Sequence, residues 1–212
     1  MQYKAFYHKI SFIAQAKLPG TESHFQLAPP YRKPYDLETI RHKNPKLAAV
    51  MILLFPLDDQ LAFVLTERAA YAGYHSKQIS FPGGKKEASD ADLIHTAIRE
   101  TQEEIGVLIP ESNIIRSLTE IYIPPSNFLV KPVLASVDFQ PDFTPNHEVA
   151  NIVTGRISDL LNTSNQKTKK VLTTKNKSVT APGFVLNKVF VWGATAMILN
   201  ELKDILHQIE AI

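Results

Sequence analysis

The stretch FPGGKKEASDADLIHTAIRETQEEIGV, residues 81–107, decides how this chain is expected to fold. It begins with a Pro-Gly-Gly turn and ends at Gly106, a residue type that readily closes a helix in a left-handed conformation. Nothing in residues 91–105 breaks a helix, and Ser89 or Asp90 is placed to cap its first turn. The sequence therefore predicts a helix over 91–105 that is entered through a tight glycine turn.

The predicted helix has an apolar face and an acidic face. At about 100° per residue, one stripe is expected to face a core; it consists of Leu93, Ala97, Thr101 and Ile105. Glu100, Glu103 and Glu104 fall within an arc of about 100° beside that stripe. This arrangement opposes helix stability, because Glu100 and Glu104 repel each other by about 0.2–0.5 kcal/mol and the last turn of a helix favours cations.

Three carboxylates on one patch suit a hard divalent cation such as Mg²⁺ or Mn²⁺. Such ions take oxygen ligands and often keep coordinated waters that a substrate phosphate can replace. The alternative interpretation is a solvated acidic face of a surface helix. The Gly-Gly entry, the Arg99-Glu100 pair and the Gly106 exit favour the metal site.

The same residues carry a family resemblance. Gly84, the pair Arg99-Glu100, the pair Glu103-Glu104 and Gly106 resemble the Nudix box, Gly-x5-Glu-x7-Arg-Glu-U-x-Glu-Glu-x-Gly-U, where U is bulky and apolar. The span from Gly84 to Arg99 is one residue longer than the general pattern. Asp90 stands where the first Glu is expected, and Thr101 replaces an apolar residue.

The longer spacing and Asp90 resemble the coenzyme A pyrophosphatase branch of the Nudix hydrolases. The upstream segments 65–69 (LTERA) and 78–84 (QISFPGG) are similar to the additional motif of that branch. Gly73 stands at the second Arg position of that motif and Lys77 at its Gly position. Segments 122–133 and 192–196 also resemble the branch, so the resemblance covers most of the chain beyond residue 46.

The expected fold class is α/β, namely the Nudix fold, an α/β/α sandwich with a mixed β-sheet. With 212 residues and 44% apolar content, one globular domain with a sizeable core is expected. Residues 1–46 contain short apolar-periodic and Pro-rich passages, and they are predicted to form an N-terminal arm packing on the domain. Residues 47–212 are predicted to form the Nudix hydrolase domain.

Periodicity and turn residues give the expected elements around the helix. Strands are predicted at 47–55 and 61–66, joined by the turn 57–60, and at 113–123, 128–139, 149–153 and 185–191. Short and long helices are predicted at 157–161 and 192–206, and Trp192 is expected to be a core anchor.

The resemblance implies roles for the charged residues of the site. One to three Mg²⁺ or Mn²⁺ ions are expected on Glu100, Glu103 and Glu104, joined by the Gly84 carbonyl and by Glu148. They would neutralise the substrate pyrophosphate and lower the pKa of a bound water. Either Glu103 or Glu148 is expected to remove the proton, and Arg99 to orient the helix carboxylates through ion pairs. The alternative for Glu148 is a surface acid.

Three residues are candidates for substrate binding. Arg68 is placed to contact a phosphate bidentately, or else to form a surface salt bridge with a neighbouring acid. Phe128 is predicted either to contact a base or pantetheine arm or to pack in the core, and Lys77 lies in the loop entering the box. The lysines of 167–177 are interpreted either as a site for the 3′-phosphate of coenzyme A or as a solvated loop.

The predicted reaction is metal-dependent hydrolysis of coenzyme A or acyl-coenzyme A to 3′,5′-ADP and (acyl-)4′-phosphopantetheine. The first alternative is a Nudix hydrolase of another nucleoside diphosphate derivative or nucleotide. The second is a Nudix-fold binding module without turnover, against which the four retained charges of the box argue. Fold kinship alone does not decide among these chemistries.

Composition limits the partners. A net charge of +2 gives no reason to expect nucleic acid as a partner, and the absence of cysteine excludes disulfides and thiolate metal ligands. No apolar run of 18 residues occurs, so no membrane span is expected. The sequence predicts a cytoplasmic enzyme, monomer or homodimer, that acts on a small-molecule substrate.

Overall fold

A mixed β-sheet forms the centre of the computed structural model, which describes residues 1–69, 78–173 and 177–210. The strand order is β3-β2-β1-β7-β5, with β4 on β1, β6 on β7 and β8 on β2. β1 and β7 run parallel, and the other pairs are antiparallel. These strands are β1 Lys46–Leu57, β2 Gln60–Arg68, β3 Ile79–Ser80, β4 Gly83–Lys85, β5 Ile114–Ser117, β6 Ile121–Ile123, β7 Phe128–Ser136 and β8 Val149–Arg156.

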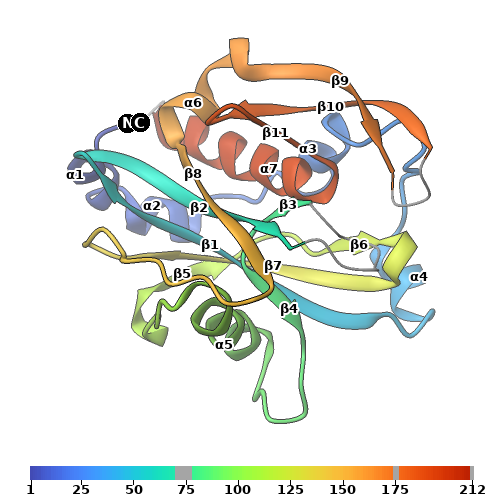
Figure 1. Ribbon diagram of the computed structural model, residues 1–212, viewed down its shortest axis with the longest axis horizontal. Coiled ribbons are helices and arrows are strands. Elements are labelled where there is room, and N and C mark those ends of the chain that lie inside the picture. Colours follow the sequence, from blue (N-terminus) through green and yellow to red (C-terminus); the bar gives the residue numbers. More distant parts are fainter. Residues whose placement is uncertain (70–77, 174–176, 211–212) are drawn as a thin grey trace.

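Two long helices cover the two faces of this sheet (Figure 1). Along β1, Met51 and Leu53 pack in the same cluster as Ala97 of α5 (Leu93–Ile105). The alternating residues Ile52 and Leu54 pack in the other cluster, with α7 (Gly193–Glu210). Successive strand side chains point to opposite faces, so the continuous apolar run of β1 serves both cores. The predicted α/β/α sandwich with a mixed sheet is confirmed.

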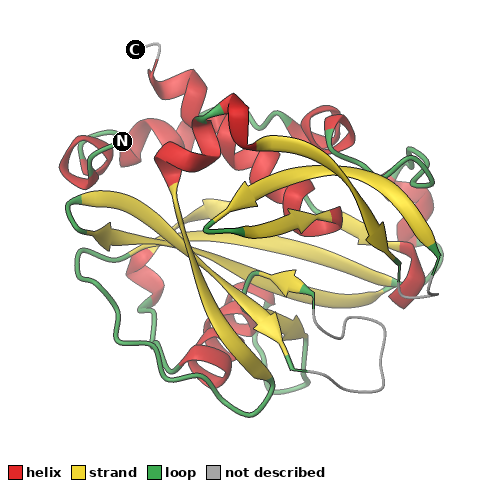
Figure 2. Ribbon diagram, turned by 45° about the horizontal axis from the view of Figure 1, so that its top comes forward, coloured by secondary structure: helices red, strands yellow, loops and turns green. Residues whose placement is uncertain are grey.

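A second, three-stranded antiparallel sheet packs beside α7 (Figure 2). It consists of β9 Gln166–Leu172, β10 Ser178–Leu186 and β11 Val189–Trp192. The prediction of one strand over 185–191 is wrong, because Asn187 and Lys188 turn the chain with φ of 45° and 69°. Both values lie in the left-handed region typical of a tight hairpin turn.

Most other predicted elements are confirmed with small shifts. Asp58 and Asp59 make the turn between β1 and β2, and α6 covers Ile157–Leu161. The strand predicted over 113–123 divides into β5 and β6, after a 3₁₀ turn. The remaining short helices are η1 Glu111–Asn113, η2 Pro124–Ser126 and η3 Thr163–Asn165. No helix in the described ranges is both long and apolar enough to cross a lipid bilayer.

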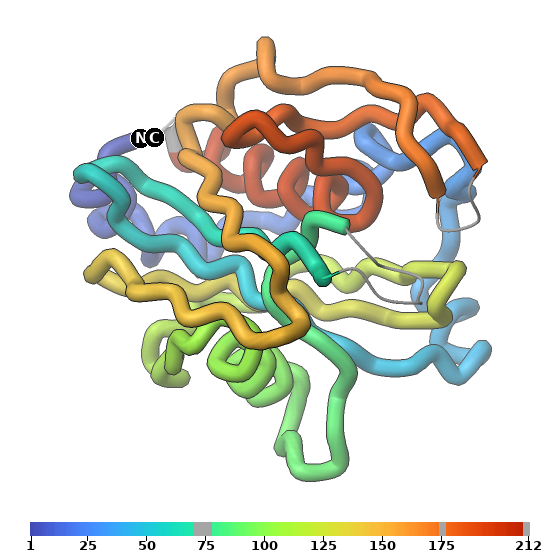
Figure 3. Tube along the Cα trace, viewed as in Figure 1, coloured from blue at the N-terminus to red at the C-terminus, as the bar shows by residue number. Residues whose placement is uncertain are grey.

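The N-terminal segment runs along α7 and the sheet edge (Figure 3). It carries α1 Tyr3–Tyr7, α2 Ile10–Gln15, α3 Gly20–Gln26 and α4 Leu37–Arg41. Its side chains Phe6 and Ile13 are fully buried in the core cluster that α7 shares. The division of the chain at residue 46 stays a prediction.

A buried carboxylate fixes this segment to α7. Glu201 is fully buried and accepts hydrogen bonds from His24 Nε2 (2.9 Å) and from the Gly20 amide (3.2 Å). It also accepts from the amide and hydroxyl of Thr119, at 3.2 and 2.5 Å. Because a buried carboxylate is stable only when its oxygens are satisfied, these donors hold the arm in one position.

Candidate active site

The helix of the site, α5, is built as the sequence predicts except at its start. Its cap is Asp92, whose carboxylate accepts from the amides of Ile94 and His95 at 2.8 and 2.9 Å. The helix ends at Gly106, with φ of 75°. The prediction of Ser89 or Asp90 as cap is therefore wrong, because the helix begins two residues later than expected.

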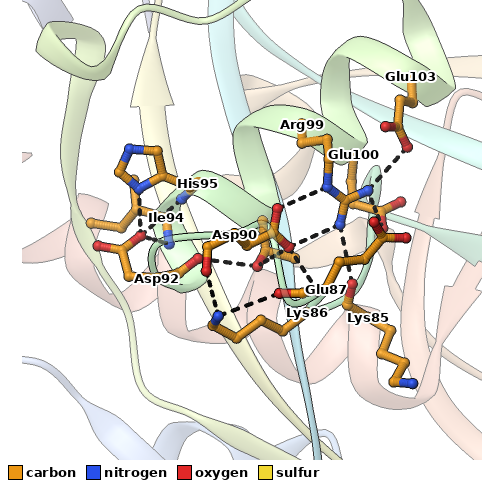
Figure 4. Close-up of polar contacts among 11 residues, drawn as sticks. Lys85, Lys86, Glu87, Asp90, Asp92, Ile94, His95, Arg99, Glu100 and Glu103 are labelled. Carbon is orange, nitrogen blue, oxygen red and sulfur yellow. Dashed lines mark hydrogen bonds and ion pairs between the residues drawn. The ribbon is translucent and has the colours of Figure 1, made fainter.

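Arg99 is the centre of a dense network at the start of the site (Figure 4). Its Nε and Nη2 donate to the two oxygens of Asp90 at 2.9 and 3.0 Å. Its Nη1 donates to Glu100 and Glu103, both at 3.0 Å, and Nη2 also donates to the Lys85 carbonyl at 3.2 Å. The ion pairs predicted between Arg99 and the helix carboxylates are present, and the hydrogen bond to the Lys85 carbonyl joins α5 to the end of β4.

Asp90 is the partner that the sequence argument missed. It is buried, and its Oδ2 also accepts from the Glu87 amide (2.8 Å) and the Thr96 hydroxyl (2.9 Å). The Arg99 guanidinium holds the pKa of this carboxyl well below its usual range, and Asp90 in turn raises the pKa of Arg99. The Asp at the position of the first box Glu therefore orients the arginine of the box.

A second arginine joins the other end of α5 to the strand β8. Arg68, at the end of β2, donates from Nη1 to Glu104 at 3.2 Å and from Nη2 to Glu148 at 3.0 Å. Glu104 is buried, whereas the Glu148 side chain is 49% exposed. The salt bridge predicted as one alternative for Arg68 is thus present, with Glu104 and Glu148 as the partners.

The carboxylates near Arg68 are electrostatically costly. Burial raises the pKa of Glu104 to about 7, and the charges of Glu100 and Glu148 add to this effect. Burial also raises the pKa of Glu100, with contributions from Glu103 and Glu148. Burial is the largest cause of both raised pKa values, and the like charges of neighbouring carboxylates add to it despite Arg68 and Arg99.

Two glycines bring the backbone against these carboxylates. A Cβ on Gly84 would lie 2.4 Å from the carboxylate of Glu100, and a Cβ on Gly83 would lie 2.3 Å from the Ala49 carbonyl oxygen. The Gly83 amide donates to Glu104 at 3.1 Å. The Gly-Gly turn is therefore required both for the approach to β1 and for the contact with α5.

The loop before β8 places Glu148 beside the end of α5. The amides of Thr144 and Asn146 donate to the last helix carbonyls, those of Ile105 and Glu104, at 2.9 and 3.0 Å. These contacts satisfy acceptors that a helix leaves free at its C-terminus. They need Gly106, since a Cβ there would lie 2.9 Å from Thr144.

The donor set fits a hard divalent cation, which Nudix hydrolases generally use. Within the described ranges, no three acidic or histidine side chains are arranged around one point to hold a metal. The carboxylates pair instead with Arg68 and Arg99, and positive charge already lies between Glu104 and Glu148. Glu100 and Glu104 have raised pKa values, so a nearby cation would stabilise their ionised forms. Carboxylate oxygens are the ligands that Mg²⁺ and Mn²⁺ prefer. The metal-ligand and catalytic roles of these residues stay predictions.

A cavity of about 890 Å³ opens beside the Gly-Gly turn. Arg68, Phe128 and Gly84 line it, which places two of the predicted substrate-binding residues at its wall. Phe128 also packs against the core and lies 5.8 Å from the Lys46 ammonium; its contact with a substrate stays a prediction. The third, Lys77, lies outside the described residues, as does Gly73.

The cavity also bears on the predictions for Trp192 and for the lysines of the β9–β10 hairpin. Trp192 lines it and is only partly buried, so the prediction of a core anchor is wrong; it stands at the end of β11, just before α7. Of the hairpin lysines that the structure describes, Lys177 lines the cavity, while those of β9 are exposed. Lys169 lies 5.3 Å from the Phe190 ring, and Lys175 lies outside the described residues.

The comparisons with known proteins agree with this fold. The family model described as the NUDIX domain matches residues 45–173. A crystal structure of a MutT/nudix family protein from Enterococcus faecalis shares the fold, with a TM-score of 0.55 at 19% identity, covering 98% of this chain and 76% of that one. The chain belongs to the Nudix family, and it is a Nudix pyrophosphohydrolase.

The chain is also similar in sequence to individual curated members of the Nudix family. It is 35% identical to the mitochondrial coenzyme A diphosphatase NUDT8 of Homo sapiens, over 73% of this chain and 67% of that protein. Identity to the protein of the same name from Mus musculus is 37%, over 73% and 75% of the two chains. An uncharacterized Nudix hydrolase NudL of Enterobacter sp. is 31% identical, over 75% and 82%. The cytoplasmic location expected for this chain stays a prediction.

Proposed function

We propose that this chain hydrolyses the pyrophosphate bond of coenzyme A or acyl-coenzyme A, giving 3′,5′-ADP and (acyl-)4′-phosphopantetheine. The observation that carries the proposal is the cavity beside the box. Its described lining contains six cationic residues and no carboxylate, together with seven aromatic residues. A ligand with several phosphates, a base and a long uncharged arm matches such a wall.

Mg²⁺ or Mn²⁺ would be held by Glu100, Glu103 and Glu104, with the Gly84 carbonyl and Glu148 as further donors. When bound, such an ion supplies charge neutralisation at the pyrophosphate and a more acidic water. Arg99 keeps Glu100 and Glu103 oriented through its ion pairs. Arg68 lines the cavity, and its guanidinium, which pairs with Glu104 and Glu148 in the structure, would bind a phosphate there.

Two carboxylates are candidates for the general base. The side chains of Glu103 and Glu148 are 54% and 49% exposed, so water reaches both. Each is held by one arginine, Arg99 or Arg68 respectively. The proton of the attacking water would pass to one of these carboxylates, and a phosphate monoester would leave from the attacked phosphorus.

Mass spectrometry of the products tests the proposal. The protein is incubated with coenzyme A and Mg²⁺ or Mn²⁺, with Glu103→Gln as the blank. Formation of 3′,5′-ADP and 4′-phosphopantetheine is the expected result. Intact coenzyme A at high enzyme concentration would refute the assignment.

A second candidate is hydrolysis of another nucleoside diphosphate derivative or nucleotide. It is favoured by two positions of the coenzyme A motif, where Gly73 replaces an Arg and Lys77 replaces a Gly. ADP-ribose and deoxynucleoside triphosphates therefore run in parallel in the same assay. Cleavage of one of these, with coenzyme A untouched, would establish this second function.

A further inference from the structure

Positive charge lines the cavity without any matching acid in its described wall. The cationic lining residues are Arg32, Lys33, Lys43, Arg68, Lys85 and Lys177. Three of them come from the N-terminal arm, outside the range that the family model matches. A concave wall of one sign of charge concentrates ligands of the opposite sign, so the arm contributes to anion binding.

Arg32 differs from the other arginines of the described chain. Those that pair with carboxylates are Arg41, Arg68, Arg99 and Arg156. Arg116 has no carboxylate either, but its Nη1 donates to the carbonyls of Ile13 and Ala16 at 3.0 and 2.6 Å. Arg32 has neither a carboxylate partner nor such a set of carbonyls among the described residues.

The position of Arg32 is nevertheless fixed. Its Nη2 donates to the carbonyl of Tyr122, in β6. The Tyr122 amide donates to the Tyr35 hydroxyl at 2.8 Å, and the rings of these tyrosines meet edge to face at 5.8 Å. The arm thus grips both backbone groups of one residue at the cavity wall, which orders the guanidinium before any ligand arrives.

One donor of Arg32 is unsatisfied, although the guanidinium also has the Tyr35 side chain as a hydrogen-bond partner. Its Nε is buried and has no hydrogen-bond partner among the described residues. Burial lowers the pKa of the guanidinium, which nevertheless stays charged at neutral pH. Arg32 is partly buried, and a partly buried cation without a carboxylate partner costs free energy in the empty protein. Such a group is stabilised when an anion enters the cavity.

We propose that Arg32 binds the ribose 3′-phosphate of coenzyme A, a phosphate separate from the scissile pyrophosphate. This assignment rests on the proposed function, in which the pyrophosphate lies at the box. The pantetheine arm carries no charge, so the 3′-phosphate is the other anionic group of that substrate. A monoester phosphate carries about −1.5 to −2 charge and accepts the paired N–H groups of a guanidinium. The subsite belongs to the arm and not to the exposed lysines of β9.

Equilibrium binding without metal tests the subsite directly. Calorimetric Kd values are measured in EDTA for adenosine 3′,5′-bisphosphate and for adenosine 5′-monophosphate. The native protein is expected to prefer the bisphosphate. Arg32→Gln should weaken bisphosphate binding about 10- to 100-fold and leave the monophosphate unchanged, while Arg32→Lys retains part of the preference. Equal affinities of the native protein for the two nucleotides would overturn the proposal.

Arg41→Gln is the matched control, because Arg41 lies on the same arm, is exposed, and does not line the cavity. It should bind both nucleotides like the native protein. The melting temperature separates binding from a structural role. Arg32→Gln should change Tm little, because removing a charge without a carboxylate partner offsets the lost hydrogen bonds to Tyr122 and Tyr35. A lower Tm combined with equal loss for both nucleotides would make Arg32 a structural residue.

Turnover of coenzyme A and 3′-dephospho-coenzyme A completes the test. In Arg32→Gln, the KM for coenzyme A should rise while kcat and the constants for the dephospho form stay constant. If the native protein hydrolyses neither compound yet still prefers the bisphosphate, the proposed function fails and the anion subsite stands. If it hydrolyses both equally well, with no change in Arg32→Gln, the subsite fails and the function stands.

Discussion

Two arginine-centred networks hold the carboxylates of α5, and they differ in their electrostatic balance. Arg99 pairs with three carboxylates, and its two hydrogen bonds to the buried Asp90 hold the pKa of that carboxyl well below its usual range. Around Arg68 one guanidinium serves two carboxylates, and the pKa of Glu104 is raised to about 7. The first network stabilises the fold, whereas the second stores unfavourable charge in the region where a cation and a phosphate are expected. Raised pKa values of this kind are typical of functional sites.

The largest effect is expected from Glu104→Gln, which breaks the second network. Activity with coenzyme A should fall about 10²- to 10³-fold, because the variant lacks a proposed ligand of the metal that would neutralise the pyrophosphate. The metal-free protein should nevertheless melt at a higher temperature at pH 8, since Gln mimics the protonated acid. Initial rates and thermal melts in EDTA measure the two effects. A lower Tm at pH 8 would show that the ionised Glu104 stabilises the fold, and that the network around Arg68 does not store unfavourable charge.

Asp90→Asn breaks the first network and should act in the opposite way. Removing one member of a largely buried ion pair leaves Arg99 short of an acceptor and should lower the free energy of unfolding by about 3 kcal/mol. Urea titration at pH 7 measures this loss. The control is Asp58→Asn, which breaks the exposed pair with Arg156 and should cost less than about 1 kcal/mol. Equal losses in the two variants would show that Asp90 is not a stabilising partner.

The pH dependence of stability should follow Glu104. Its pKa is higher in the folded chain than in the unfolded one, so the folded state favours the proton. The associated stability is complete below about pH 4.5 and is lost as the pH rises to about 7, amounting to roughly 3 kcal/mol. Asp90 changes nothing in that window, because it is ionised in both states. Urea titrations of the metal-free protein from pH 5 to 8 should show this decline.

The same titrations on Glu104→Gln give the control for the pH series. The difference between native and variant isolates Glu104 from the histidines, which titrate in both proteins. The difference should shrink when Mg²⁺ is added, since the ion favours the ionised carboxylate. A slope that Glu104→Gln leaves unchanged would assign the decline to another group.

The smallest effect is expected from Gly84→Ala. The added Cβ would displace the Glu100 carboxylate, which is the flexible end of a long side chain, so the fold should tolerate it. The displaced ligand should weaken Mn²⁺ affinity about tenfold. Calorimetric titration with Mn²⁺ measures the change, and an unaltered Kd would argue against Glu100 as a ligand.

The sequence predicts the layered fold well because its local signals agree. The run of β1, the hairpin at Asp58 and the helix ending at Gly106 are each determined by residues close together in the chain. Thr101 is a polar residue in the apolar stripe of α5, and the structure buries it as the stripe predicts. It is buried among apolar residues because its hydroxyl donates to the Ala97 carbonyl at 2.6 Å, within the same helix.

The sequence predicts the ion pairs of Arg99 with the helix carboxylates, but not the partners of Arg68 or the pairing of Asp90 with Arg99. Spacing on one helix identifies Glu100, Glu103 and Glu104, whereas the pairing of Arg68 with Glu148 joins residues 80 positions apart. Arg32 was missed for the same reason. Nothing near it in the sequence indicates that Tyr35 and Tyr122 hold it at a cavity wall. Only the absence of a neighbouring acid was a usable signal.

The buried contact between Glu201 and His24 also sets an order of events during synthesis. The two residues are 177 positions apart, and at about 5–20 residues per second α7 leaves the ribosome roughly 9–35 seconds after the arm. During that interval Phe6 and Ile13 have no α7 to cover them, and the nascent chain exposes them to chaperones and proteases. The N-terminal arm, which carries Arg32, is therefore synthesised early but packs against α7 only at the end of synthesis. The cavity that Arg32 lines is thus among the last parts of the protein to form.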